Sequence, residues 1–183
     1  MRATTRFGGV GLLLVLLLLP ARALGHPPAP GDDSIKARLK ACLLMGELAC
    51  VVDQYLLLKD IGRVPDWLVA FQGAFAVANR KAGECEKVAR LIHEGLTRLG
   101  QRPEWVRFTV HGPRKVLGFD ELSRGAVSRT HQLATTGHHV AIQLEGKLID
   151  AYTGPAGLPF AEYLSRLHVD SGSRLLHEVI QKP

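Results

Sequence analysis

Residues 137–154, with the sequence GHHVAIQLEGKLIDAYTG, decide the fold that the rest of the chain has to complete. Two short runs of strand-forming residues flank Glu145-Gly146, and an acidic residue followed by glycine between such runs is a turn signal. A histidine pair opens the first run, and an aspartate lies inside the second. We therefore predict a β-hairpin that carries a general base and the carboxylate that orients it.

The length of the turn decides which histidine meets Asp150, because side chains on a strand alternate between its two faces. A two-residue turn places Leu144 opposite Lys147, and His139 then shares a face with Asp150. A three-residue turn would select His138 instead. Glutamate is a poor first residue for a tight turn, so both histidines are candidates at this point.

Upstream, residues 83–100 have the apolar spacing of one amphipathic helix, with a glycine at each boundary. Cys85 falls in its first turn, on the side that faces the core. The positive end of a helix dipole lowers the pKa of a thiol from its free value of about 8.5 and favours the nucleophilic thiolate. Cys85, His139 and Asp150 have the order and setting of a Cys-His-Asp hydrolase site.

At these residues the chain resembles the papain-fold toxin domains of bacterial polymorphic toxin systems. The similarity covers about residues 80 to 167 and rests on short motifs: Gly83-Glu84-Cys85, His139-Val140-Ala141-Ile142, Gly146-Lys147-Leu148-Ile149-Asp150, and Gly157-Leu158-Pro159 before Glu162-Tyr163-Leu164. It implies an α+β, papain-like fold in which helices precede a small antiparallel sheet.

The same resemblance implies the roles of the site residues: Cys85 as the nucleophile, His139 as the base and Asp150 as its orienter. Related cysteine proteases bind the oxyanion with a side-chain amide before the nucleophile, more often glutamine, and Asn79 is the nearest candidate here. The implied activity is that of a thiol protease or protein deamidase that acts as a bacterial toxin or effector. Its partners would be a protein substrate and a cognate immunity protein. Peptidase, deamidase and acyl transferase share a thioester, so the sequence does not separate them.

Residues 1–25 have the layout of a secretory signal peptide, with two arginines, an apolar run and then small residues around the cleavage positions after Ala23 or Gly25. We predict a secreted or periplasmic protein with no stable membrane span after cleavage, with an uncleaved anchor as the alternative. Losing the leader's three arginines and no acid lowers the formal charge from +6 to +3. That charge, without a basic and aromatic patch, does not predict nucleic-acid binding.

The rest of the chain divides into three parts: a Pro-rich linker at residues 26–33, a helical segment at 34–79 and a papain-like catalytic domain at 80–183. Within them we predict one helix from Ser34 to about Lys59, a second from Pro65 toward Asn79, a strand at 105–110 and a helix at 160–167. Residues 114–136 give a weak pattern, which we interpret as a loop with a short helix near 120–126. A last short helix is predicted within 170–181.

Three cysteines are an odd number for an exported chain, so one must stay unpaired or pair between chains. In one unbroken helix Cys42 and Cys50 would lie roughly 12 Å apart, beyond the reach of a disulfide. A bridge between them therefore requires a break, for which Gly46 is the natural place. Cys85 is then the free thiol.

Two other hypotheses stay open from the sequence. The first is a non-catalytic exported binding protein in which Cys85 fills the core, since free cysteine is often buried. The second is a metal site that uses His131, His138 and His139 with Cys85 or Asp150. No close-spaced ligand motif supports it, and neighbouring histidines in a strand point to opposite faces, so we predict no cofactor.

Overall fold

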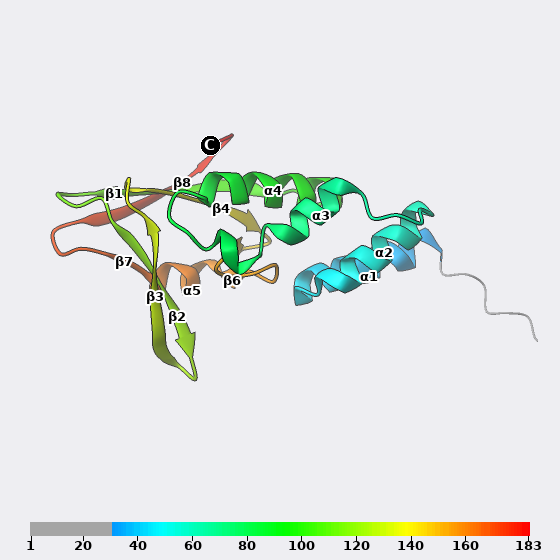
Figure 1. Ribbon diagram of the computed structural model, residues 1–183, viewed down its shortest axis with the longest axis horizontal. Helices are drawn as coiled ribbons and strands as arrows, with labels where there is room; N and C mark the ends of the chain where they lie inside the picture. Colours follow the sequence, from blue (N-terminus) through cyan, green and yellow to red (C-terminus); the bar gives the residue numbers. More distant parts are fainter. Residues whose placement is uncertain (1–30) are drawn as a thin grey trace, which may run out of the picture.

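The computed structural model describes residues 31–183, so the predicted signal peptide and residues 26–30 of the linker lie outside the described residues. The fold is α+β, with helices followed by antiparallel sheets (Figure 1). In chain order the elements are α1 (Asp32–Met45), α2 (Leu48–Lys59), α3 (Asp66–Gly73), the 3-10 helix η1 (Val77–Asn79), α4 (Cys85–Arg98), β1 (Glu104–His111), β2 (Leu117–Ser123), β3 (Ala126–Ala134), β4 (His138–Leu144), β5 (Lys147–Ile149), β6 (Leu158–Pro159), α5 (Phe160–Ser165), β7 (Leu167–Val169) and β8 (Arg174–Ile180).

The predicted hairpin is formed by β4 and β5, which lie inside a five-stranded sheet of order β6-β5-β4-β1-β8. Leu144 pairs with Lys147, and Glu145 and Gly146 have φ angles of 49° and 76°. These left-handed conformations make the tight, two-residue primed turn. Of the two turn lengths that the sequence left open, the two-residue turn is therefore the one that forms, and it fixes which face of β4 each histidine occupies. A second sheet of three strands has the order β3-β2-β7.

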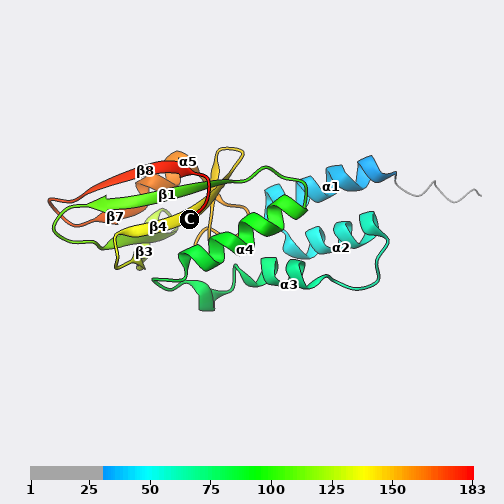
Figure 2. The same ribbon diagram turned by 90° about the horizontal axis from the view of Figure 1, so that it is seen from above.

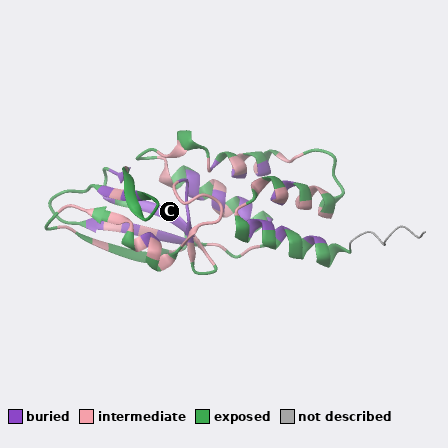
Figure 3. Ribbon diagram, turned by 90° about the horizontal axis from the view of Figure 1, so that it is seen from below, coloured by how far each residue is buried: buried purple, intermediate pink, exposed green. Residues whose placement is uncertain are grey.

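Both faces of the five-stranded sheet are covered, which produces two hydrophobic clusters. On one face α4 packs over Val140 and Ile142, with α1, α2 and α3 beyond it (Figure 2). On the other face Phe108 and Ala141 pack with the three-stranded sheet and α5. Buried residues gather between the helices and along the strands, with exposed residues outside them (Figure 3).

The predicted helix that carries Cys85 is confirmed, and it is α4. Its buried residues are Val88, Ala89, Ile92, Gly95 and Leu96, which lie on one face because they recur at helical spacing. A Cβ atom at Gly95 would lie 2.3 Å from the ring of Phe71. Glycine there lets α3 pack directly on α4, and this contact helps to fix the N-terminal helices against the sheet.

The predicted single helix of residues 34–59 is two helices, with Gly46 between them in the left-handed region (φ 73°). This break brings Cys42 and Cys50 to a Cα–Cα distance of 5.7 Å, and they form a disulfide. Cys85 is the free cysteine of the described chain. Across residues 31–183, none of the helices combines the length and the apolar character needed to cross a bilayer.

Three predictions at the weaker parts of the sequence are wrong. The second helix stops at Gly73, because the chain turns there before η1. Residues 117–134 are the hairpin β2–β3 rather than a loop with a helix, and the chain reverses at Arg124 and Gly125, whose φ angles are 52° and 80°. Residues 174–180 are strand β8 rather than a helix, because they pair with the edge of β1.

Candidate functional site

His139 lies in β4 opposite Phe108 of β1, and its side chain is buried on the face that also carries α5. Its Nε2 atom is 3.2 Å from Oδ2 of Asp150 and 2.9 Å from the hydroxyl of Tyr163. The ring of Phe108 stacks beside the imidazole, with centroids 6.1 Å apart. A histidine held by two polar partners in a closed environment has one orientation.

The Asp150 carboxylate is buried directly after β5, where the chain leaves the sheet in an Asx turn. Its Oδ1 accepts the N–H groups of Tyr152 (2.8 Å) and Thr153 (2.9 Å). Its Oδ2 accepts the Tyr163 hydroxyl at 2.7 Å and faces His139. Burial opposes the charged form of Asp150. The hydrogen bond and the charge of His139 favour it, as do the hydrogen bonds from the Tyr163 hydroxyl and the Thr153 N–H, and together they lower the pKa of Asp150 below its usual value. Asp150 is therefore an ionised, fully hydrogen-bonded carboxylate.

The hydrogen bonds determine which nitrogen of His139 exchanges its proton. Burial and the charge of Asp150 raise the pKa of Tyr163 well above its usual value, so the phenol keeps its single proton and donates it to Asp150. The Tyr163 oxygen and the carboxylate then both accept from Nε2–H. Nδ1 is buried and makes no hydrogen bond within residues 31–183. Nδ1 is therefore the atom that can take or give a proton.

Cys85 is the first residue of α4 and is partly exposed. Its side chain and His139 line one small pocket, together with Asn79, Val88 and Tyr152 among others. The chain reaches this arrangement because β5 pairs only with residues 142–144 of β4, which leaves the earlier part of that edge to the N-terminus of α4. The pocket encloses about 10 Å³, so it has room for about one water molecule.

Cys85 and His139 shift each other's pKa in opposite directions. Burial opposes the thiolate, but the His139 ring and the backbone N–H groups of Val140 and Glu86 lower the pKa of Cys85. Burial also opposes the imidazolium, but Asp150 and Cys85 together raise the pKa of His139 to about 9. Within the described residues the Nδ1–sulfur pair does not meet ordinary hydrogen-bond geometry, yet the direct contact of the two side chains contributes more to both pKa shifts than their charges do. These shifts favour a thiolate–imidazolium pair near neutral pH.

Asn79, the predicted oxyanion donor, lines the same pocket, but its amide is already engaged. Nδ2 donates to the carbonyl of Gly73 at 2.8 Å and lies 3.4 Å from that of Ala74, at the end of α3. The start of α4 offers other donors, because the first backbone bond into the helix runs from Val88 N–H to Glu84. The Cys85 N–H is one of the groups left without an intrahelical partner.

The other histidines lie elsewhere. His138 points to the opposite face of β4, where its Nδ1 is 3.4 Å from the Thr109 hydroxyl at an exposed position. His131 pairs with Glu121 at 2.8 Å. Residues 31–183 contain no group of three or more side chains placed to hold a metal ion. The structure thus brings together Cys85, His139 and Asp150, and leaves the other members of the metal hypothesis apart.

Tyr163 is the site residue that sequence reasoning missed. It belongs to α5 and packs between Phe108 and Phe119, with ring centroids at 5.6 and 5.4 Å. A tyrosine inside a short apolar helix is most simply a core residue, and no spacing rule connects it with Asp150. Only the fold places its hydroxyl between the carboxylate and the imidazole.

Comparison of the chain with models of known protein families, with characterised proteins and with solved structures finds no match in any of the three. The function is therefore inferred from the geometry and chemistry of the site.

Proposed function

We propose that this protein is a cysteine hydrolase of papain-like fold that cleaves or deamidates an amide of a protein substrate. The observation that carries the proposal is the state of His139. Its Nε2 is held by Asp150 and Tyr163, its Nδ1 makes no hydrogen bond to the part of the chain that the structure describes, and the residue lines one pocket with Cys85. A buried histidine oriented on one side and open toward a thiol on the other is the arrangement that nucleophilic catalysis requires.

In the proposed reaction, the Cys85 thiolate attacks the carbonyl carbon of the amide, and a carbon–sulfur bond forms as the carbonyl oxygen becomes an oxyanion. His139 then gives its Nδ1 proton to the leaving amine, and the carbon–nitrogen bond breaks. The product is a thioester on Cys85. His139 next takes a proton from water, and the hydroxide attacks the thioester carbonyl. The carbon–sulfur bond then breaks, which releases the carboxylic acid and regenerates the thiolate–imidazolium pair. With a glutamine side chain as substrate, the leaving group is ammonia.

The oxyanion would be stabilised first by the Cys85 N–H, since it belongs to the first turn of α4 and has no partner within the helix. Asn79 stays a candidate for a second donor, and it could serve only by giving up a bond to Gly73 or Ala74. We therefore expect Asn79→Ala to affect the rate less than loss of the thiol or the imidazole does.

The pocket around the thiol is too small for a side chain, so only the reacting carbonyl group would enter it. The rest of the substrate would lie across the surface beside the start of α4. The role of bacterial toxin or effector and a cognate immunity protein as partner are parts of the proposal that rest on the motifs of the family resemblance. Export is a part that rests on the signal-peptide layout of residues 1–25.

The test combines thiol chemistry with growth. The full chain and its Cys85→Ala variant are expressed in the periplasm of a bacterial host at equal abundance, and the purified proteins are treated with iodoacetamide between pH 5 and 9. We expect growth arrest by the intact protein only, and alkylation that persists well below the usual thiol pKa. Harmless expression of both forms, together with slow alkylation at pH 7, would replace the proposal with the non-catalytic binding protein.

A further inference from the structure

A second opening that involves α4 lies at the opposite end of this helix from Cys85. A groove of about 360 Å³ lies where α1, α2 and the C-terminus of α4 meet, and we call it the helical groove. Its lining consists of Lys36, Leu39, Lys40, Tyr55, Leu58, Lys59, Arg98, Leu99, Gly100 and Gln101. With about 1.5 Å of rise per residue, the helix places this groove roughly 20 Å from the thiol. It is therefore separate from the candidate catalytic site.

The helical groove combines an apolar surface with one sign of charge. Leu39 and Leu99 are buried, and Leu58 and the ring of Tyr55 are partly exposed beside them. Four cations line it, and no carboxylate does. Cations that share a groove without acids repel one another, and an anion placed among them removes that repulsion.

The ion pairs of these cations leave them available to a ligand. Lys36 is 3.5 Å from Asp33 and Arg98 is 2.9 Å from Glu94, and all four of these side chains are largely exposed. Exposed pairs of this kind contribute little free energy. Lys59 makes no ion pair within residues 31–183. The acids offset part of the positive charge, but each of these exposed contacts can be exchanged for the carboxylate of a ligand at little cost in free energy.

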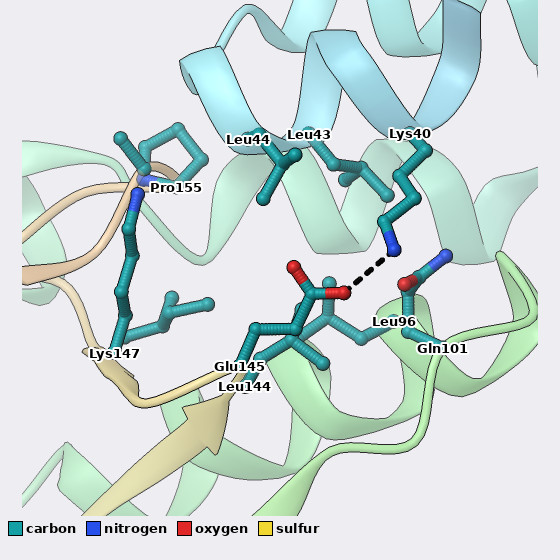
Figure 4. A pocket seen from close by; sticks show the side chains of 11 residues that line it. Lys40, Leu43, Leu44, Leu96, Gln101, Leu144, Glu145, Lys147 and Pro155 are labelled. Carbon is teal, nitrogen blue, oxygen red and sulfur yellow. Dashed lines mark ion pairs between the residues drawn. The ribbon is translucent and has the colours of Figure 1, made fainter. Parts of the chain in front are cut away.

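The inner end of the helical groove limits the size of its ligand. Lys40 reaches across from α1 to Glu145 in the β4–β5 turn, at 2.7 Å, with the Gln101 amide beside the pair (Figure 4). The apolar space behind this pair, lined by Leu43, Leu144 and their neighbours, is only about 20 Å³. A ligand must therefore fit in front of Lys40, in a volume at the lower end of the range for small-molecule sites.

We propose that the helical groove binds a small amphipathic anion, a carboxylate on an unbranched alkyl chain of about eight to ten carbons. The chain would lie on Leu39, Leu58 and the Tyr55 ring, and the head group would lie between Lys36 and Lys59. This inference goes beyond the proposed hydrolase activity and does not require it, because no residue of the groove belongs to the catalytic site.

Trp67 provides a direct readout of binding. Its ring contacts two lining residues: it packs edge-on against Tyr55, with centroids 5.1 Å apart, and the Arg98 guanidinium carbon lies 5.5 Å from its centroid. The chain has two tryptophans, and the other one, Trp105, stacks on His93. Ligand in the groove should change the fluorescence of Trp67. The Trp67→Phe variant should no longer show this change, although the fluorescence of Trp105 remains.

The experiment titrates the full chain with octanoate, octan-1-ol and acetate at pH 7, below any micelle formation. We expect saturable binding of octanoate, with octanol and acetate each weaker by at least about tenfold, because binding needs both the chain and the charge. The Lys36→Glu/Lys59→Glu variant should weaken octanoate binding by about tenfold or more. Arg174→Glu/Lys182→Glu makes the same change of charge at exposed positions outside the groove and should bind as the intact protein does.

Thermal unfolding of each variant checks that it is folded. Equal affinity for octanol and octanoate would overturn the role of the cations, and equal weakening by the Arg174→Glu/Lys182→Glu control would reduce the effect to net charge. Absence of saturation with octanoate would overturn the site itself. Cys85→Ala should bind octanoate as the intact protein does, so failure of this inference and failure of the hydrolase proposal are distinguishable.

Discussion

The substitution Tyr163→Phe tests whether the buried hydroxyl holds the candidate site together. It removes one oxygen that donates to Asp150 at 2.7 Å and lies 2.9 Å from Nε2 of His139. The ring remains, and so does its packing against Phe108 and Phe119. The change therefore isolates the polar contacts from the hydrophobic ones.

The expected loss of folding free energy depends on which hydrogen bonds Asp150 and His139 keep in the variant. A hydrogen bond to a charged group contributes about 1.5–3 kcal/mol. Asp150 Oδ2 retains the His139 N–H as a donor, so the carboxylate is not left unpaired and the cost should be about 2 kcal/mol. For a chain of this length, that loss lowers Tm by about 4–8 °C. Since Tyr163 lowers the pKa of Asp150, the variant should also raise that pKa.

Urea and thermal unfolding measure the stability, and the alkylation rate of Cys85 at pH 7 measures the site. Tyr152→Phe is the matched control, because its partly exposed hydroxyl makes only a 3.4 Å contact with the Gln132 carbonyl, so we expect a change below about 0.5 kcal/mol. A loss for Tyr163→Phe as small as that of the control would refute the reasoning. If Tyr163 acts only by packing, the phenylalanine variant should keep both the stability and the Cys85 alkylation rate of the intact protein.

Three further predictions concern the pH dependence of stability, the close packing at Gly46 and the Cys42–Cys50 disulfide. The raised pKa of His139 adds stability that is lost as pH rises toward about 9, and the lowered pKa of Cys85 adds stability that is lost as pH falls. At a pH where the folded thiol is ionised and the folded imidazole is protonated, the proton that His139 takes up on folding offsets the proton that Cys85 releases. Urea unfolding of the intact protein should therefore depend little on pH at this site, whereas Cys85→Ala should lose stability as pH rises toward about 9. Gly46→Ala should cost about 1–3 kcal/mol, since its Cβ would lie 2.8 Å from the Ala156 backbone nitrogen at φ 73°, while Gly62→Ala, which has open space, should not destabilise the fold. Replacing Cys42 and Cys50 by serine should lower the unfolding free energy by about 2.5 kcal/mol, by the entropy of the loop that the disulfide closes, with unfolding in urea as the measurement.

The parts of the fold that the sequence predicts are those with local signals. The helix at Cys85 has apolar residues at regular helical spacing, and β1 alternates from Val106 to Val110, so each is determined by its own residues. The choice of His139 over His138 also depends on a local feature, the tight turn at Glu145 and Gly146. For these elements, pattern and structure agree because the burial of one face decides the conformation.

The parts that the sequence does not predict depend on distant partners. Leu175, Leu176 and Val179 can be fitted to a helical spacing, yet they form β8 because β1 offers an unpaired edge. The β2–β3 hairpin is rich in polar residues, and Asp120 is buried there only because Thr130 and His168 bond to it from the neighbouring strands. Tyr163 belongs to the same class, since its role requires β5 and α5 to meet.

The way in which the two hydrophobic clusters meet explains why the histidine is buried and the thiol is not. Cys85 belongs to the helix on one face of the sheet, whereas His139 points to the other face. They meet where β5 ends, because β5 pairs only with residues 142–144 and no other described strand pairs with that edge of β4 before them. On the inner side, His139 is closed in by Phe108 and Tyr163, which excludes water from the base and its carboxylate. On the outer side, Cys85 stays partly exposed at the start of α4, so a substrate can reach the sulfur without entering the core.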